Sequence, residues 1–101
     1  MSTVNIRPEL HRILQSERIN PEIVLREAAL LRLLAQREQL RLEISGFEQT
    51  YHSDFFTYEQ RIHSQKNSED FAVEEDLMDW EFALKSLEAV NGKLTTLLAT
   101  S

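Results

Sequence analysis

Residues 46–63 read GFEQTYHSDFFTYEQRIH, and this stretch decides how the rest of the chain is arranged. It gathers aromatic and histidine side chains at Phe47, Tyr51, His52, Phe55, Phe56, Tyr58 and His63. Phe55, Tyr58 and Ile62 have the i, i+3, i+7 spacing of a short helix, with Ser53 or Asp54 as its N-cap. We therefore expect a packed helical connector over residues 53–64 rather than a reactive loop.

The segment before this stretch predicts one long helix over residues 20–51. Asn20 and Pro21 supply an N-cap and a first-turn proline, which suit a helix start because the first backbone N–H groups lack partners there. Arg26 and Arg37 fall on the apolar seam that follows, and we expect their guanidinium groups to reach acids or solvent. The apolar members of the seam recur at heptad positions and are Ile23, Leu30, Leu33, Leu40, Ile44 and Phe47.

The segment after the stretch predicts a second long helix over residues 71–98. Two rows of residues repeat along it every seven positions, namely Leu77, Leu84, Asn91 and Leu98, with Trp80, Leu87 and Leu94 between them. Glu74, Glu75 and Asp76 stand at its start, where the helix macrodipole favours negative charge by about 0.3 to 1 kcal/mol each. Antiparallel pairing places these acids near Arg37 and Arg41, so charge supports that direction while the apolar seams drive the fold.

Together these patterns predict an all-α fold, an antiparallel, coiled-coil-like hairpin of two long helices. A short N-terminal helix is expected over residues 8–17, where Leu10, Ile13 and Leu14 share a face that could pack within the chain or against a neighbouring subunit. The length of 101 residues fits a single domain, 1–101. Apolar residues that fall off the seams would be exposed, so we expect an oligomeric helical bundle, with a homodimer favoured. These residues are Leu31, Leu34, Leu42 and Val90.

Charge is distributed unevenly along the chain and argues against nucleic acid as a direct ligand. Residues 1–45 carry seven Arg and six Glu, a net charge of +1, whereas residues 46–101 carry four basic and eleven acidic residues, a net charge of −7. Neither part offers the clustered cations that a phosphate backbone requires. The chain has no cysteine and no long uncharged apolar run. We therefore expect a cytoplasmic protein without disulfides or a membrane span.

Metal binding and catalysis have some candidate residues but lack the usual motifs. His52 and His63, with Asp54 and Glu59 nearby, have side chains that can bind a metal. The chain nevertheless lacks the His-x-x-x-His and paired Glu-x-x-His motifs of metal sites in helical bundles. It also lacks a nucleophile beside a base and a Gly-rich phosphate loop. We expect no metal, no cofactor and no enzymatic activity.

Acidic residues concentrate at residues 68–81, SEDFAVEEDLMDWE, which hold seven acids and no base. A surface of this charge steers a basic protein toward it and mainly raises the association rate. Two aromatic residues that leave the predicted seams are candidate apolar anchors beside it. The predicted partner-binding residues are thus Phe56, Glu74, Glu75, Asp79 and Phe82. A solvated helix face is the alternative explanation of the acids.

A further pattern over about residues 40–90 reads Phe-Glu-x-x-Tyr, a short aromatic helix, an acidic loop and Asp-x-x-x-Trp. Its members are Phe47, Glu48, Tyr51, Phe55, Asp76 and Trp80. The pattern resembles small helical proteins of bacteria, cyanobacteria and archaea that look like partners of toxin-like gene products. The resemblance implies an antitoxin-like protein that masks a basic partner. The chain departs from the pattern at His52, where a glycine often follows the tyrosine, and its loop lacks the expected glycine, so the turn could differ.

The alternative function is a self-assembling helical scaffold with no dedicated partner.

Overall fold

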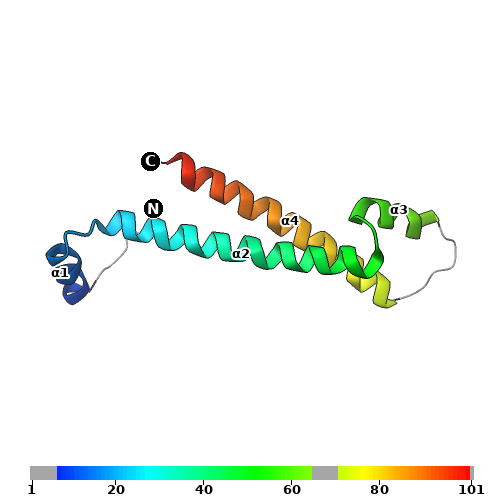
Figure 1. Cartoon of the computed structure of the whole chain (residues 1–101), viewed down its shortest axis with the longest axis horizontal. Coiled ribbons are helices and arrows are strands. Elements are labelled where there is room, and N and C mark those ends of the chain that lie inside the picture. Colours follow the sequence, from blue (N-terminus) through cyan, green and yellow to red (C-terminus); the bar gives the residue numbers. More distant parts are fainter. Residues whose placement is uncertain (1–6, 65–70, 101) are drawn as a thin grey trace.

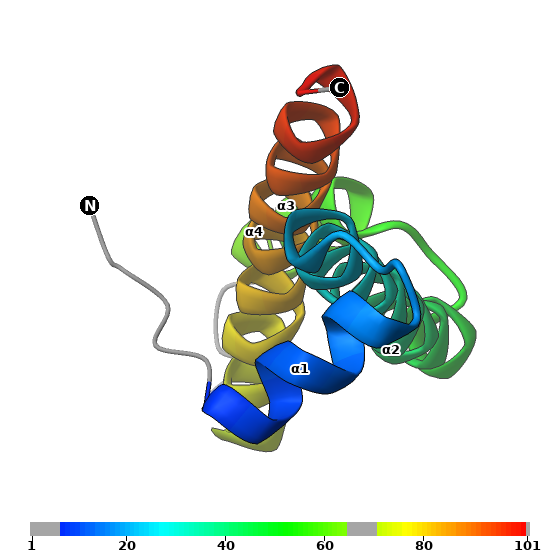
Figure 2. The same ribbon diagram turned by 90° about the vertical axis from the view of Figure 1, so that its left-hand side faces the viewer.

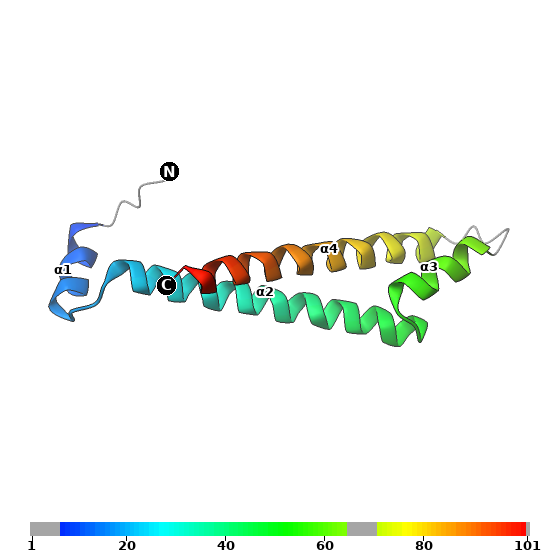
Figure 3. The same ribbon diagram turned by 90° about the horizontal axis from the view of Figure 1, so that it is seen from above.

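The computed structural model describes residues 7–64 and 71–100, which form four helices without a strand. The helices are α1 (Pro8–Ser16), α2 (Pro21–Tyr51), α3 (Phe55–Ser64) and α4 (Phe71–Ala99). α2 and α4 run antiparallel beside one another, with α1 at one end of the pair and α3 at the other (Figures 1 and 3). The predicted all-α hairpin is confirmed, and each helix begins and ends within two residues of its predicted bounds.

The start and end of α2 follow from local sequence signals. The side-chain oxygen of Asn20 accepts a hydrogen bond from the backbone N–H of Glu22 at 2.9 Å, and Pro21 is the first helical residue. The helix stops at His52, whose φ of 50° and ψ of 40° lie in the left-handed region. Glycine usually supplies this conformation at the C-terminal end of a helix. The histidine therefore makes the turn that the missing glycine would have made.

The start of α3 is capped by Asp54. Its carboxylate accepts hydrogen bonds from the backbone N–H and the hydroxyl of Thr57, both at 2.8 Å. These two bonds lower the pKa of Asp54 because they stabilise the charged carboxylate. The hydroxyl of Ser53 instead donates to the carbonyl oxygen of Asp54 at 3.0 Å. Of the two predicted candidates, Asp54 is therefore the cap.

The seam of α2 lies against α4 as predicted, except at its first residue. Ile44 is buried, and the half-buried members of the seam are Leu30, Leu33, Leu40 and Phe47. Arg26 and Arg37 are also half-buried, in agreement with their heptad positions. Ile23, in the first turn of α2, is 50% exposed. α2 and α4 diverge at the end of the hairpin where α2 begins (Figures 1 and 2). The prediction of Ile23 as a core residue is therefore wrong for the single chain.

One of the two predicted rows of α4 faces the core. Trp80 and Leu94 are buried, at 1% and 4% exposure, and Leu87 is half-buried. Leu77 and Leu84, from the other predicted row, are half-buried and pack against the core cluster around Trp80. They do so because α4 has two neighbouring helices, α2 and α3, which together cover a wider face than one partner helix would.

The second row of α4 is displaced by one residue from the predicted row. Ala83 and Val90 are 1% and 6% exposed, and Leu97 is half-buried. Asn91 is exposed and Leu98 is 67% exposed, so neither lies in the seam. Val90, which was expected on the surface, belongs to the core instead. Ala83 belongs to the buried cluster with Ile44 of α2, Phe55 of α3 and Trp80, so a residue with little apolar surface occupies a central position.

α1 stands apart from the hairpin and lies across its open end (Figure 2). None of its residues is buried, and Leu10 and Ile13 are 51% and 59% exposed. The molecule is elongated, at 67 × 26 × 24 Å, and its radius of gyration is 20.6 Å, against about 13 Å for a compact domain of 100 residues. No helix within the described ranges is long and apolar enough to cross a membrane.

Candidate protein-binding groove

The aromatic residues of the 46–63 stretch form a packed joint around Trp80. Four rings contact its indole, with centroid distances of 5.6 Å for Phe47, 5.9 Å for Tyr51, 5.5 Å for Phe55 and 6.3 Å for Tyr58. The hydroxyl of Tyr51 donates a hydrogen bond to the carboxylate of Asp76, which ties the end of α2 to the start of α4. Because one buried tryptophan contacts both α2 and α3, the joint fixes the relative positions of three helices.

The two histidines of the stretch lie outside this joint. His52 and His63 are both exposed. In residues 7–64 and 71–100, no group of three His, Cys, Asp or Glu side chains could hold a metal ion. The absence of a metal from the chain as a whole stays a prediction.

A groove between α2 and α4 borders the joint and has a volume of about 510 Å³. It is lined by Glu43, Gly46, Phe47 and Thr50 of α2 and by Asp76, Asp79 and Phe82 of α4. Three of these side chains are carboxylates, and no Lys or Arg is among them. The ring of Phe82 is 72% exposed. The groove therefore combines negative charge with an accessible aromatic side chain.

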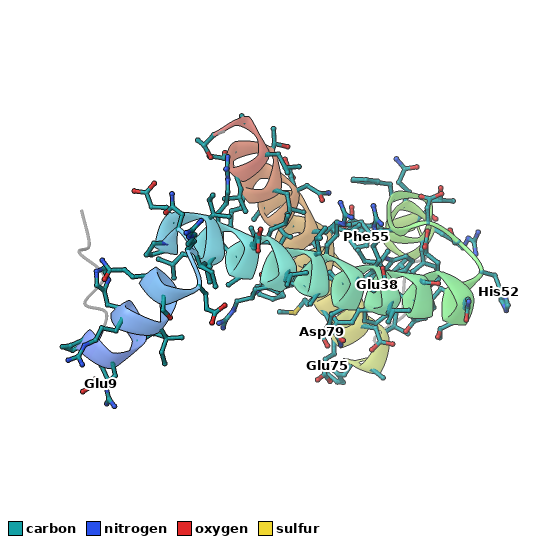
Figure 4. The ribbon with its side chains drawn as sticks, turned by 60° about the vertical axis from the view of Figure 1, so that its left-hand side comes forward. Glu9, Glu38, His52, Phe55, Glu75 and Asp79 are labelled. Atoms are coloured by element: carbon teal, nitrogen blue, oxygen red, sulfur yellow. The ribbon has the colours of Figure 1, made fainter. Side chains whose placement is uncertain are left out.

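Asp79 and Phe82, which the sequence predicts as binding residues, both line this groove. Glu75 lies one turn before Asp79 on the same face of α4, and the two carboxylates lie next to one another in Figure 4. This face of α4 extends beyond the two acids. Its further members are set by the spacing i, i+4, i+7 and i+11, which gives Phe71, Glu75, Met78 and Phe82. Phe71 and Met78 are 79% and 72% exposed. Three apolar side chains on this face of α4 are therefore exposed.

Phe56 and Glu74, the other predicted binding residues, lie elsewhere. Phe56 lines a separate groove of about 280 Å³ between α3 and α4, together with Glu81 and Lys85. Glu74 shares the helix face of Glu81 and Lys85, because it precedes them by seven and eleven residues. α3 packs on the flank of α4 away from the acidic groove, as the position of Phe55 relative to Glu75 and Asp79 shows (Figure 4). The five predicted residues therefore do not form one surface.

The ion pair of α4 lies within the helix and not between helices. The Nζ atom of Lys85 lies 2.8 Å from a carboxylate oxygen of Glu81, and this exposed pair raises the pKa of Lys85. In the part of the chain that the structure describes, Arg37 and Arg41 form no ion pair with the acids at the start of α4. Apolar packing and the hydrogen bond between Tyr51 and Asp76 join the antiparallel pair, and the predicted attraction of Arg37 and Arg41 to the acids does not take the form of an ion pair.

The sequence interpretation missed the α2 wall of the acidic groove. Glu43, Gly46 and Thr50 recur at i, i+3 and i+7, directly beside the seam residues Ile44 and Phe47. This spacing identifies a flank of α2 that borders its contact with α4. A search for polar and small residues at the positions next to the seam would have found them.

Comparisons with protein-family models, with curated proteins and with solved structures find no match for this chain. The resemblance to antitoxin-like proteins gains no support from them. The groove combines three carboxylates with the exposed ring of Phe82, so it can attract positive charge and cover apolar surface. These properties suit recognition of another polypeptide.

Proposed function

We propose that this chain is a non-catalytic protein-binding module that holds a basic segment of a partner protein in the acidic groove between α2 and α4. The observation that carries the proposal is the presence of Glu43, Asp76 and Asp79 in one groove with the exposed ring of Phe82. Aromatic anchors with surrounding polar groups supply most of the affinity at protein interfaces. Clustered carboxylates add selectivity for a positively charged partner.

The groove favours an antitoxin-like role, in which the chain covers a basic toxin-like protein. Asp76 already accepts a hydrogen bond from Tyr51, so Glu43 and Asp79 are the carboxylates most available to a ligand. Their charge raises the rate of encounter with a basic protein, while burial of the Phe82 ring slows its release. The expected cytoplasmic location and the absence of direct nucleic-acid binding are part of the same proposal.

Self-assembly is a second candidate, which the large surface of the chain supports. The accessible area is 8414 Å², whereas a folded monomer of 11.8 kDa exposes roughly 5,900 Å². Leu31 and Leu42 are 68% and 61% exposed, as their positions off the seam predict. A second copy that covered part of this surface would bury apolar area, which favours a homodimer.

Changes in the groove test the proposed function. The purified chain captures its partner from an extract of the native host, and association and dissociation rates are then measured with the isolated partner. Phe82→Ala should speed dissociation, with a loss of about 1 to 3 kcal/mol in binding free energy. Asp79→Lys should slow association and weaken its dependence on salt.

A matched control is available on the same helix. Leu98 is 67% exposed on α4, close to the exposure of Phe82, but it lies at the far end of the helix. Leu98→Ala should bind the partner like the wild type. If the two groove variants also bind like the wild type, the groove is a solvated surface and the proposal is wrong.

A further inference from the structure

α1 is an amphipathic helix that has no partner within its own chain. Its apolar face consists of Leu10, Ile13 and Leu14, of which the first two are more than half exposed. Arg7 and Arg18 flank the two ends of the helix. Neither forms an ion pair in the described part of the chain. An acid stands beside each of them, Glu9 in the first turn and Glu17 at the C-cap, so residues 7–18 carry three arginines and two glutamates, a net charge of +1. α1 therefore presents an apolar face with a small positive net charge, opposite in sign to that of the acidic groove.

The groove of the same chain lies too far away for α1 to reach. Gly46, in the groove wall, lies about 37 Å along α2 from Pro21, at 1.5 Å per residue. The link of residues 17–20 spans at most about 14 Å, and α1 itself is about 13 Å long. Figures 1 and 3 show α1 at the end of the hairpin where α2 begins, and the turn from α2 into α3 at the other end. Contact between α1 and the groove therefore requires two chains.

We propose that two copies of this chain pair side by side in opposite directions, and that α1 of each copy lies in the acidic groove of the other. The inference rests on the proposed function, because it uses the same groove and names a second copy as an occupant. In this arrangement the apolar face of α1 covers Phe82, and Arg7 and Arg18 approach Glu43 and Asp79. The contact buries apolar surface on both sides, and the net charge of α1 is opposite in sign to that of the groove.

Symmetry and area both favour this pairing. A two-fold axis between antiparallel copies forms two identical α1–groove contacts and leaves no unpaired end, so the assembly closes as a dimer. A standard interface buries about 800 Å² of each partner. The chain exposes roughly 2,500 Å² more than a compact monomer of its mass, so a dimer of this kind has ample surface to bury.

Cysteine cross-linking in the full-length chain tests the arrangement, since the natural sequence has no cysteine. Ile13→Cys places a thiol on α1, and Gly46→Cys places one in the groove wall. Gly92→Cys is the matched control, because it is also a helical glycine but lies far from the groove. A Cβ atom added at either glycine meets no other atom within 4 Å, so both variants should fold.

The two cysteine variants are mixed in equal amounts and treated with a short flexible bis-maleimide. Ile13→Cys with Gly46→Cys should give several-fold more covalent heterodimer than Ile13→Cys with Gly92→Cys. A chain that carries both Ile13→Cys and Gly46→Cys should form linked dimers rather than internally linked monomers. Equal yields for Gly46→Cys and Gly92→Cys, or an internal link within one chain, would overturn the inference.

A third change separates this inference from the proposed function. Phe82→Ala in the Gly46→Cys chain should lower the cross-linking yield, because it removes the ring that α1 covers. If cross-linking fails while capture of the host partner still depends on Phe82, only the dimer arrangement is wrong. If cross-linking succeeds while capture is unaffected by Phe82→Ala, the arrangement stands and the groove serves self-assembly instead of a different partner.

Discussion

At the scale of single residues, His52 shows how the chain turns without a glycine. Its backbone N–H donates to the carbonyl oxygen of Glu48, and the N–H of Ser53 reaches the same oxygen at 3.3 Å. The hydrogen bonds of the helix end are therefore made. A left-handed conformation nevertheless costs a residue with a Cβ atom roughly 1 kcal/mol or more, because that atom approaches the following carbonyl oxygen.

Replacement of this histidine tests that cost directly. His52→Gly should raise the free energy of unfolding by about 0.5 to 1 kcal/mol, because glycine adopts the left-handed conformation without the steric penalty. His52→Ala keeps the Cβ atom and should give no gain. Urea unfolding followed by circular dichroism measures both variants. A glycine variant that unfolds at the same urea concentration as the wild type would show that the turn is not strained.

At the scale of helices, apolar spacing predicted the buried face of α2 better than that of α4. α2 has one long partner, so its heptad rows coincide with its buried face even at Arg26 and Arg37. α4 also contacts α3, so large residues such as Leu84 gain partial burial from a second direction. Ala83 is buried in the cluster that joins α4 to Ile44 of α2 and Phe55 of α3. Spacing alone does not reveal this, because alanine contributes little to an apolar pattern.

The binding groove was predicted only in part, for a related reason. Asp79 and Phe82 were identified because acids and an aromatic residue stand close together in the sequence. The side of α4 on which α3 packs depends on the turn at His52 and the joint around Trp80, which are features of tertiary structure. Phe56 was therefore assigned to a surface that it does not share, and Glu43 of α2 was missed.

Trp80, at the centre of the aromatic joint, should contribute more to the free energy of unfolding than any other aromatic side chain. Trp80→Ala removes the ring that four aromatic side chains surround, and should lower the free energy of unfolding by about 3 to 5 kcal/mol. Phe82→Ala, two residues away and 72% exposed in the single chain, should lower it by much less, because its ring lies outside the joint. Thermal unfolding followed by circular dichroism at 222 nm compares the two variants. Tryptophan fluorescence cannot be used, because Trp80→Ala removes the single tryptophan. Similar losses in both variants would contradict the role of the joint.

At the scale of the whole molecule, elongation is the dominant property. A 67 Å chain with apolar side chains exposed on α1, α2 and α4 has a high ratio of surface to volume. Small domains already bury a limited fraction of their surface when they fold. Association between copies is the simplest way for this chain to bury more.

The solution state follows from this shape. At micromolar concentration we expect a dimer by sedimentation, and its longest dimension by small-angle X-ray scattering should stay close to the 67 Å of one chain. The length hardly changes because antiparallel copies lie side by side. A dimer of nearly twice that length would indicate end-to-end contact. A fully helical monomer would contradict the prediction and leave the exposed leucines for a different protein.

The position of the aromatic joint also sets the order in which the hairpin folds. Tyr51 and Asp76 are separated by 25 residues, whereas Ile23 and Thr100, which line one groove at the open end, are about 77 residues apart. Direct closure of the longer loop costs about 1 kcal/mol more in chain entropy. Once the joint has formed, each following turn of α4 meets the adjacent turn of α2 with little further loop to close. The hairpin therefore assembles from the joint outward, and thermal fluctuations open it first at the end from which α1 extends.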